Sequence, residues 1–307
     1  MKLGIGLPQS ATMNLRADVV KIARAAEETG FTSLWVFERI LVPVRPTQGL
    51  YDIPGLPWPQ SYQHIADSLT VLTAAAVVTS QVRLGTSVLV APLHVPTELA
   101  RGLATLDLIS GGRVIAGFGS GWSIDEYAAA GADINTRGRA LDETIDVCRA
   151  VWGTDPVSVK GDRTLIDNAN VGPKPTNQIP IMLGGGWSYR ARDRIARRAD
   201  GWLPAGMPGP ALKSSWDQIR EAATAHGRDA GALRMIPRAD IELTDTPLGA
   251  DRQPFQGSMD QVIDDLVGNA EAGADELLIE LQMTVRYAEE LLDRALEIKD
   301  RVAAAGI

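Results

Sequence analysis

The chain has 307 residues, with 38 acidic against 30 basic side chains, a formal net charge of −8 and a single cysteine. The acidic balance argues against a nucleic-acid surface, which needs clustered Lys and Arg, so a small-molecule substrate is the expected partner. One cysteine cannot form an internal disulfide, and no apolar run approaches the roughly 20 residues of a membrane helix. Because the first expected strand begins at Leu3, we expect no signal peptide and a cytoplasmic protein.

Short apolar strands alternate with amphipathic helices from end to end, a pattern that predicts a parallel sheet covered by helices in one domain, residues 1–307. Eight strands are expected, at Leu3–Leu7, Ser33–Phe37, Val82–Val90, Arg113–Phe118, Ile179–Leu183, Gly201–Leu203, Arg234–Leu243 and Glu276–Leu281. Their helices are expected to begin near Leu15, Ser61, Pro96, Ser123 (with a break near Asn135), Ser188, Pro210, Ser258 and Val285. Gly30, Gly227 and Gly273 stand where helices should end. Cys148 falls in the apolar register of a helix and is expected in the core.

Two connections are too long for simple turns. The loop Ile40–Gln60, rich in proline and aromatic residues, follows the second strand and is a candidate lid over the face that carries the strands' carboxyl ends. The segment Gly153–Thr176 is expected to form an accessory hairpin before the fifth strand and to act as a structural cover.

Bare backbone follows the fourth strand at Gly119, Ser120, Gly121 and Trp122, where a ligand can touch the main chain. The spacing of these glycines does not match a dinucleotide fingerprint, and Ser120 lacks the flanking glycines of an esterase nucleophile. A tight turn that packs Trp122 is the structural alternative.

A second glycine run, Gly184, Gly185 and Gly186, ends the fifth strand, and Ser188 is a plausible N-cap of the helix that follows. Arg190 lies in the first turn of that helix, where the helix dipole disfavours a cation. A bound anion would relieve this mismatch, and free amides at a helix start attract anions. A solvated basic face remains the alternative for the later residues Arg197 and Arg198.

Several segments taken together closely resemble the luciferase-like monooxygenase family, in particular the actinobacterial branch that uses the deazaflavin coenzyme F420. They are KLGIGLPQ (2–9), LWVFER (34–39), RLGTSVL (83–89), ATLDLISGGR (104–113), GFGSGW (117–122), PIMLGGG (180–186), ADGW (199–202) and SMDQVIDDLVGNAEAGADELLI (258–279). The resemblance implies a single (β/α)8 TIM barrel that binds F420 or FMN at the carboxyl ends of its strands. It also implies hydride transfer to or from a small organic substrate, and a homodimer. We place the dimer interface on the helices after the second to fourth strands, because the helix at 69–80 is apolar on more than one face.

The resemblance also assigns cofactor-binding residues. Thr86, Ser87 and Val88 match a bulge with a non-prolyl cis peptide that supports the ring, and His94 matches a position near the cofactor tail. Gly119 and Gly121 would let the ring or ribityl chain approach, while Trp122 and Glu126 would face the pocket or a neighbouring subunit. The cofactor phosphate is placed on Gly185, Gly186 and Ser188, with Arg190 or its neighbours as counter-charge.

The pair Glu38 and Arg39 departs from the family, which commonly has Asp-His at the end of the second strand. Arg39 stays protonated, so it can stabilise an anion but cannot take a proton from an alcohol. Glu38 could act as base if burial raised its pKa. A purely structural ion pair between the two is the alternative. This substitution favours reduction over dehydrogenation.

Three functional hypotheses remain open: an F420-dependent oxidoreductase, an FMN-dependent luciferase-like monooxygenase or reductase, and a non-catalytic F420- or flavin-binding protein. His64 is either a substrate-site acid or a solvated helix residue, and His226 is expected at the surface. No HExxH motif, cysteine cluster or acidic calcium loop occurs, so no metal site is expected.

Overall fold

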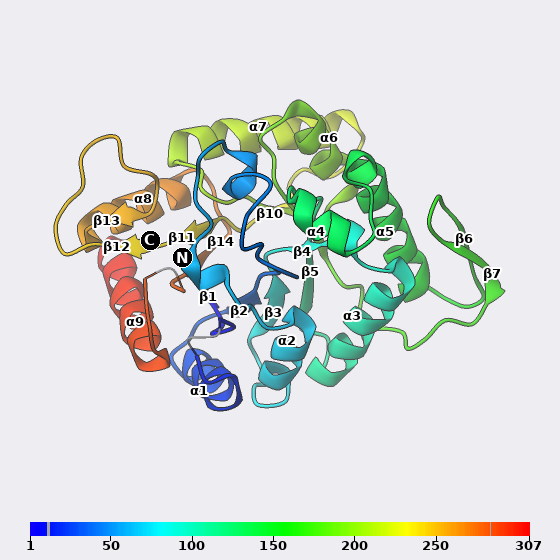
Figure 1. Ribbon diagram of the computed structural model, residues 1–307, viewed down its shortest axis with the longest axis horizontal. Helices are drawn as coiled ribbons and strands as arrows, with labels where there is room; N and C mark the ends of the chain where they lie inside the picture. Colours follow the sequence, from blue (N-terminus) through cyan, green and yellow to red (C-terminus); the bar gives the residue numbers. More distant parts are fainter. Residues whose placement is uncertain (11–12, 283) are drawn as a thin grey trace.

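A curled parallel sheet forms the centre of the molecule (Figure 1). The computed structural model describes residues 1–10, 13–282 and 284–307. The order of strands across the sheet is β10-β9-β8-β5-β3-β2-β1-β14-β11, and β4 also pairs with β5. Their bounds are β1 Lys2–Gly6, β2 Ser33–Val36, β3 Arg83–Thr86, β4 Leu89–Val90, β5 Val114–Gly119, β8 Ile181–Gly184, β9 Gly201–Leu203, β10 Arg234–Met235, β11 Arg238–Asp240 and β14 Glu276–Glu280.

Both ends of this strand order belong to one stretch of chain, residues 234–240. Within it β10 pairs with β9, and β11 pairs with β14. Between them Ile236 N donates to Trp202 O and the Pro237 carbonyl accepts from Leu278 N, each at 2.9 Å. The stretch therefore links the two sides of the sheet, which is why the sheet curls.

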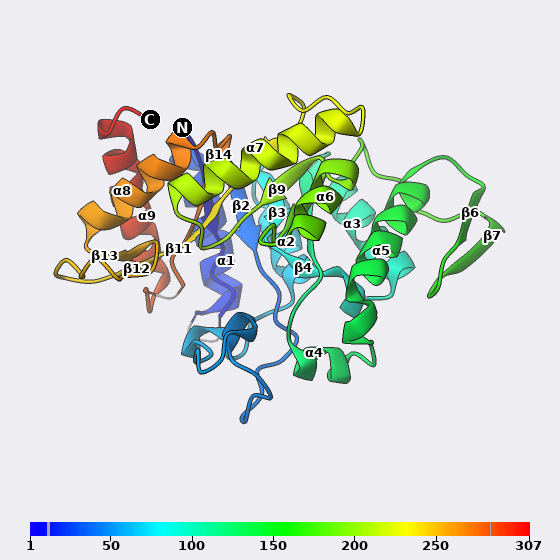
Figure 2. The same cartoon turned by 90° about the horizontal axis from the view of Figure 1, so that it is seen from above.

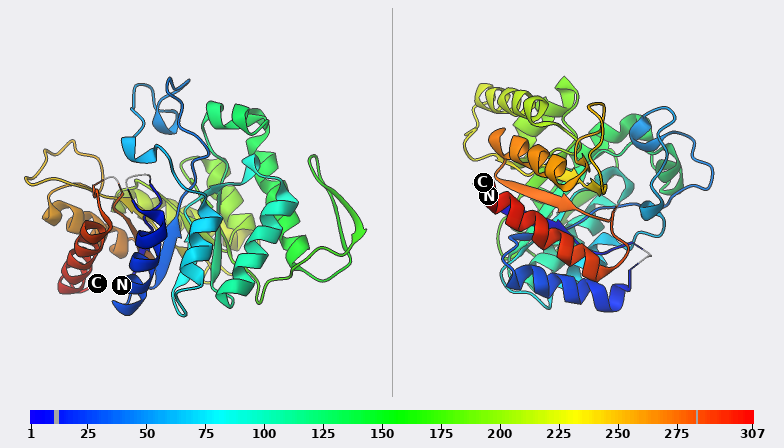
Figure 3. Two further views of the ribbon diagram at one scale, coloured as in Figure 1. Left: turned by 60° about the horizontal axis from the view of Figure 1, so that its bottom comes forward. Right: turned by 90° about the vertical axis from the view of Figure 1, so that its left-hand side faces the viewer.

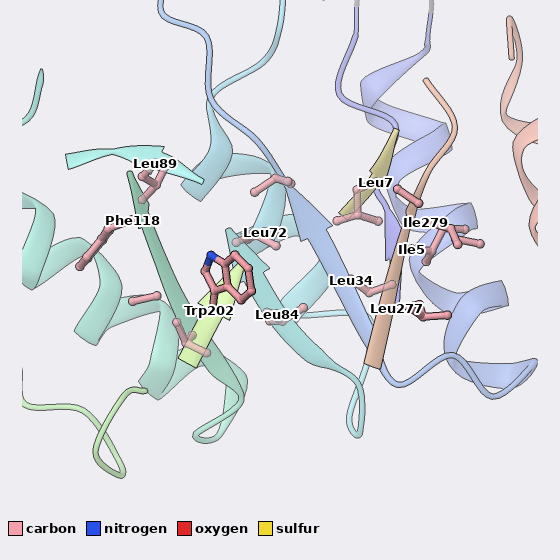
Figure 4. Close-up of a cluster of buried hydrophobic side chains, with 14 of the residues drawn as sticks. Ile5, Leu7, Leu34, Leu72, Leu84, Leu89, Phe118, Trp202, Leu277 and Ile279 are labelled. Atoms are coloured by element: carbon pink, nitrogen blue, oxygen red, sulfur yellow. The ribbon is translucent and has the colours of Figure 1, made fainter. Parts of the chain in front are cut away.

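Helices cover the outer face of the sheet (Figures 1 and 2). They are α1 Leu15–Glu28, α2 Ser68–Ala76, α3 Pro96–Ser110, α4 Ile124–Ala129, α5 Arg137–Trp152, α6 Tyr189–Arg198, α7 Gly209–Ala225, α8 Met259–Glu271 and α9 Ala288–Ala304. Short 3-10 turns occur at η1 Leu50–Asp52, η2 Gln60–Tyr62, η3 Ala91–Leu93 and η4 Ile134–Thr136. The main core fills the space between strands and helices, with Leu34, Leu84 and Ile279 among its members (Figure 4).

A second, smaller cluster lies on the other face of the strands, inside the curled sheet. It consists of Trp35, Ile115, Met182, Leu203, Ile236 and Leu278. The Trp35 indole fits there because both neighbouring strands carry glycine: a Cβ at Gly4 would lie 2.6 Å from Trp35 Nε1, and one at Gly85 would lie 2.3 Å from the ring. The concave face of the sheet is therefore filled by side chains, and the outer face by helices.

Several sequence predictions are confirmed. Gly201–Leu203 and the start of α3 at Pro96 are as expected, and α4 and α5 are separated near Asn135. Ser188 is the N-cap of α6 as predicted, and α4 and α8 begin directly after Ser123 and Ser258, near their expected starts. Cys148 is buried, and Gly30, Gly227 and Gly273 have φ of 82°, 72° and 98°. The expected hairpin is present as β6 Val157–Lys160 and β7 Leu165–Ala169, which pair antiparallel and project from the body (Figure 1).

Other boundaries were wrong. The second helix begins at Ser68, not near Ser61, because Asp67 caps it by accepting from Thr70 N at 2.8 Å. The last helix begins at Ala288 rather than near Val285. The predicted strand Arg234–Leu243 is split into β10, β11 and β12 (Glu242–Leu243), with Pro237, which has no N–H, at the first break. β12 pairs with β13 (Gln256–Gly257), a pairing that the sequence did not indicate.

The segment 40–60 and α4 lie together at one end of the molecule, and the two chain termini lie close together at the opposite end (Figure 3). Because β1 starts next to the N-terminus and the strands are parallel, the end with segment 40–60 carries the strands' carboxyl ends. The predicted cofactor and catalytic residues follow those strand ends.

Candidate functional site

The predicted bulge is present in the third strand unit. Between the pairings of β3 and of β4 with β5, this unit contains one residue more than the facing stretch of β5. The Thr86 hydroxyl fills the interrupted ladder, since it donates to Gly117 O at 2.8 Å and accepts from Gly117 N at 2.9 Å. The Ser87–Val88 peptide is cis. The bulge and the cis peptide that the resemblance implied at Thr86, Ser87 and Val88 are therefore present in the backbone.

Val88 brings together the two predicted glycine turns. A Cβ added to Gly119 would lie 2.7 Å from Val88 Cγ2, and one added to Gly184 would lie 3.1 Å from Val88 Cγ1. The half-buried Val88 side chain is thus flanked by the turns after β5 and β8, which are far apart in sequence. Sequence analysis placed these residues at one site, and the structure brings them into contact.

Three buried donors hold carbonyl groups of these backbone segments. Arg238 Nη1 donates to Ser87 O at 2.8 Å, Tyr127 Oη to Ser120 O at 2.6 Å, and Trp202 Nε1 to Gly185 O at 2.8 Å. Sequence analysis assigned a role to none of the three donors. The only available signal was the position of Trp202 in the ADGW segment. Each donor fixes the orientation of a peptide group that lines the candidate site.

Arg238 is a permanent buried cation at this site. Burial by itself lowers the pKa of its guanidinium, but Asp240, Tyr62 and Glu280 outweigh burial and raise it. Arg238 Nε donates to Asp240 Oδ1 at 2.8 Å, and the guanidinium carbon lies 4.6 Å from the centroid of Phe37. The charge is therefore fixed directly behind the Ser87 carbonyl.

Glu38 and Arg39 do not pair with each other, so the structural alternative for them was wrong. Successive residues of an extended chain point to opposite sides, and each residue has a different partner. Glu38 Oε1 lies 2.9 Å from His94 Nε2, and Arg39 Nη1 lies 2.6 Å from Glu126 Oε2. The end of β2 therefore carries two separate pairs, of which Arg39–Glu126 is buried and Glu38–His94 is partly exposed.

The first pair joins Glu38 to the loop after β4. The Glu38 carboxylate is 8% exposed, and its Oε2 accepts from Val90 N at 2.7 Å. Burial acts to lower the pKa of His94, but the hydrogen bond and the charge of Glu38 outweigh it, and the pKa is raised. Arg163, from the projecting hairpin, donates to the His94 carbonyl at 2.8 Å. His94 is thus favoured in its protonated form beside the bulge.

The second pair lies inside an aromatic enclosure. The Arg39 guanidinium carbon is 5.1, 5.6 and 5.9 Å from the ring centroids of Trp122, Tyr62 and Trp58. Burial raises the pKa of Glu126, while Arg39 acts in the opposite direction. Arg39 Nε and Trp122 Nε1 are buried and have no hydrogen-bond acceptor among the described residues. Glu126 was expected to face the pocket or a neighbouring subunit. Its carboxylate is instead paired with Arg39 of the same chain.

The segment 40–60 packs on the turn after β5. Trp58 and Trp122 have ring centroids 4.8 Å apart. Gln48 donates to Trp122 O and accepts from Ile124 N, both at 2.9 Å. The predicted lid is therefore fastened to the GFGSGW segment in this conformation.

At the triple glycine, Gly185 is exposed, has φ of 94°, and a Cβ there would meet nothing within 4 Å. Ser188 caps α6 by accepting from Ala191 N at 3.2 Å, which leaves its hydroxyl hydrogen free to donate. Arg190 is exposed and has no ion-pair partner in the described part of the chain. Arg192 donates to Gly186 O at 2.9 Å.

The later arginines of α6 form ion pairs with acidic residues of the same chain. Arg194 and Arg198 pair with Asp142 on α5, and Arg197 pairs with Asp193. Arg190 therefore remains the candidate counter-charge. Arg197 is exposed, as the alternative of a solvated basic face expects, while Arg198 is only partly exposed, and both also form ion pairs.

The other two histidines lie outside this cluster. His64 is exposed, with φ of 59°, in the loop before α2 and not in a helix. His226 is partly exposed and lies 2.9 Å from Asp193. A cavity of about 600 Å³ lies elsewhere, between the segment after β12 and the start of α9, and is lined by residues such as Thr244, Asp260 and Tyr287. None of the sequence-predicted site residues lines it.

Among the described residues, no group of three or more His, Cys, Asp and Glu side chains is arranged to hold a metal ion. No helix in the same part of the chain is both long and apolar enough to cross a membrane.

Two curated relatives share about a third of their residues with this chain where they match. An F420-dependent glucose-6-phosphate dehydrogenase of Amycolatopsis mediterranei is 31% identical over 229 residues, 73% of this chain and 64% of the relative. An FMNH2-dependent dimethylsulfone monooxygenase of Pseudomonas fluorescens is 31% identical over 227 residues, 72% of this chain and 57% of the relative. The matches thus span less than two thirds of either relative.

The fold has counterparts among solved structures. The monooxygenase RslO1 of Streptomyces bottropensis superposes with a TM-score of 0.79 over the full length of both chains, at 19% identity. The family model described as luciferase-like monooxygenase matches residues 4–304. The curled parallel sheet, the bulge after β3 and this match over nearly the whole chain agree, and the chain belongs to the luciferase-like monooxygenase family.

Proposed function

We propose that the protein is an F420-dependent oxidoreductase that reduces a small organic acceptor. The observation that carries the proposal is the contact of Val88 with Gly119 and Gly184, which surrounds one apolar side chain with backbone that has no Cβ. A flat ring system needs this combination of an apolar support and close main-chain approach. The proposal takes the curled sheet as a closed (β/α)8 barrel, supported by residues 234–240, which pair with both of its sides.

The phosphate-bearing tail would be held at the start of α6. Gly185 offers exposed backbone with open space around it, and the N-terminus of α6 favours an anion. The Ser188 hydroxyl can donate, and Arg190 supplies a free positive charge. The residues present therefore fit the cofactor, and we keep Gly185, Gly186, Ser188 and Arg190 as the proposed phosphate site.

When bound, the reduced cofactor supplies a hydride, and the chain's residues orient and protonate the acceptor. A guanidinium is always charged in proteins and has no acceptor site, so Arg39, which pairs with Glu126 among aromatic rings, cannot act as a base. Reduction of a carbonyl or an activated double bond needs a proton donor rather than a base. This supports reductase over dehydrogenase activity.

The cofactor is tested by titrating the purified protein with F420 and with FMN and following fluorescence. Micromolar F420 affinity, on the order of 8 kcal/mol, is expected. Tight FMN binding without F420 binding would instead support an FMN-dependent monooxygenase or reductase, the class of the Pseudomonas relative. Binding without acceptor-dependent oxidation of the reduced cofactor would support a non-catalytic carrier.

We also propose a homodimer that uses α2 and α3. Val77, Leu108 and Ile109, on or next to these helices, are 67%, 47% and 46% exposed, although all are large apolar side chains. The mass measured in solution at micromolar concentration tests this, and a monomer would contradict it.

A further inference from the structure

His94 and Glu38 form a carboxylate–imidazole pair, with Glu38 buried and His94 partly exposed, and the two residues come from two different strand ends. Glu38 follows β2, and His94 follows η3 after β4, 56 positions later in the chain. The Nε2–Oε1 distance of 2.9 Å is that of a hydrogen bond, and the second Glu38 oxygen is held by Val90 N. The carboxylate is therefore fixed in place and cannot rotate away from the imidazole.

The other ring nitrogen of His94, Nδ1, is free. No residue that the structure describes makes a hydrogen bond to it, and the His94 side chain is 28% exposed. A protonated imidazole donates from both nitrogens, so a His94 cation held by Glu38 through Nε2 presents its second N–H to whatever occupies the neighbouring space.

The surroundings of His94 favour its cation. Glu38 and Asp67 contribute negative charge from the end of β2 and from the residue that caps α2, and Arg163 contributes positive charge from the β6–β7 hairpin. The two acidic groups outweigh Arg163 and burial, so the pKa of His94 is raised. A raised pKa shifts the imidazole toward its cation, which is the form that a proton donor requires.

The pair adjoins the candidate cofactor site. Val90, whose N–H Glu38 holds, would contact a Cβ at Gly121 at 2.4 Å through its side chain. Glu38 and His94 are thus built onto the bulge and the glycine turn that support the proposed ring. Because Nδ1 has no hydrogen-bond partner among the described residues and the pair adjoins the glycine turn through Val90, we propose that His94 is the catalytic acid that protonates the oxygen of a carbonyl or conjugated carbonyl acceptor, with Glu38 as its positioning residue.

This inference rests on the proposed reductase function. The acceptor carbon gains the hydride supplied by the reduced cofactor, the π pair moves to oxygen, and that oxygen takes the proton from His94 Nδ1. His94 is left neutral with Nε2–H still donating to Glu38, and the cofactor is left oxidised.

The first experiment measures the imidazole titrations in the ¹⁵N-labelled full chain. With three histidines, each signal is assigned by a His→Gln variant. We expect the pKa of His94 to be raised and to fall in Glu38→Gln. The matched control is Asp193→Asn, which removes the carboxylate beside His226 and should leave His94 unchanged. A His94 pKa that is the same in Glu38→Gln and the parent would overturn the positioning role.

The second experiment uses 4-nitrophenol, whose anion resembles the oxyanion that His94 would meet. Binding of the phenolate is followed by its absorbance, with and without bound F420. We expect at least tenfold weaker binding in His94→Gln, no change in His226→Gln, and weaker binding to the parent as pH rises through the His94 pKa. Equal affinity in parent and His94→Gln, or no binding to the parent, would overturn the catalytic assignment.

The two proposals fail in different ways. If the parent binds neither F420 nor FMN, the proposed function is wrong, whereas the phenolate titration still reports on His94. If F420 binds equally to parent and His94→Gln but the phenolate does not discriminate between them, only the inference about His94 is wrong. If His94→Gln does not fold, the phenolate titration is repeated with Glu38→Gln, which keeps His94 but should lower its pKa and so weaken phenolate binding.

Discussion

Replacement of Glu126 by alanine should destabilise the protein by about 3 kcal/mol. The Arg39–Glu126 pair has a separation of 2.6 Å, and the two side chains are 9% and 2% exposed. The figure of about 0–1 kcal/mol that applies to surface ion pairs is therefore inappropriate. Breaking a buried pair by removing one partner typically costs about 3–5 kcal/mol, because it leaves an uncompensated charge.

The lower end of that range is expected for structural reasons. Trp58, Tyr62 and Trp122 remain around the guanidinium, and cation–π contacts contribute about 0.5–2 kcal/mol. Glu126 Oε1 also accepts from Ile40 N at 3.0 Å, but Ile40 is 44% exposed, so water can replace that acceptor. The main loss of stability is thus expected from the buried Arg39 charge, which no longer has an anionic partner.

The assay is urea unfolding followed by circular dichroism and by tryptophan fluorescence. It compares the parent with Glu126→Ala, with the single variants Arg39→Met and Glu126→Leu, and with their double variant. The double variant should be more stable than Glu126→Ala, because it leaves no buried charge alone. A loss below 1 kcal/mol for Glu126→Ala with an unchanged m-value, or a double variant as unstable as the sum of its single changes, would refute the reasoning.

Three further outcomes are expected. Gly185→Val should weaken F420 binding to the folded protein at least tenfold, about 1.4 kcal/mol, and should also lower stability, because φ of 94° strains a β-branched residue although its Cβ meets no neighbour; full affinity in the folded protein would show that the glycine serves only the turn. Gly119→Ala should cost about 1–3 kcal/mol by overpacking against Val88, and adding Val88→Ala should recover much of it in urea unfolding; no recovery would place the strain elsewhere. Because Glu38 raises the pKa of His94, stability from this pair should be complete below pH about 6.5 and lost as pH rises through the raised pKa, a dependence that Glu38→Gln should remove in unfolding curves measured across that range.

Much of the fold could be predicted because its signals are local. The glycine caps, the serine N-caps and the alternation of strand and helix each depend on neighbouring residues, and β9 was located at both ends. The start of α2 was placed too early because the polar stretch after the proline-rich segment can form a 3-10 turn as easily as a helix start. The first residue of α2 is fixed by its N-cap, Asp67, whose side chain accepts a hydrogen bond from Thr70 N.

The candidate site could be predicted in its backbone and not in its side-chain partners. Glycine turns and a bulge identify where main chain is exposed, so Val88, Gly119 and Gly184 were grouped correctly. The donors Arg238, Tyr127 and Trp202 reach their carbonyls across 151, 7 and 17 positions. No local pattern distinguishes such a buried donor from an ordinary core or surface residue.

At the end of β2, the adjacent residues Glu38 and Arg39 have two different roles. Glu38 and Arg39 point to opposite sides, so Arg39 holds segment 40–62 through Glu126 and the aromatic rings, while Glu38 holds His94. The two pairs share no hydrogen-bond partner, although the charge of Glu38 acts on Glu126, so each pair can be followed by its own signal. Arg39→Met should alter the fluorescence of Trp58 and Trp122 and leave the His94 titration unchanged, whereas Glu38→Gln should shift that titration with the fluorescence retained. A His94 pKa that moves in Arg39→Met as far as in Glu38→Gln would show that the strand end works as one coupled cluster.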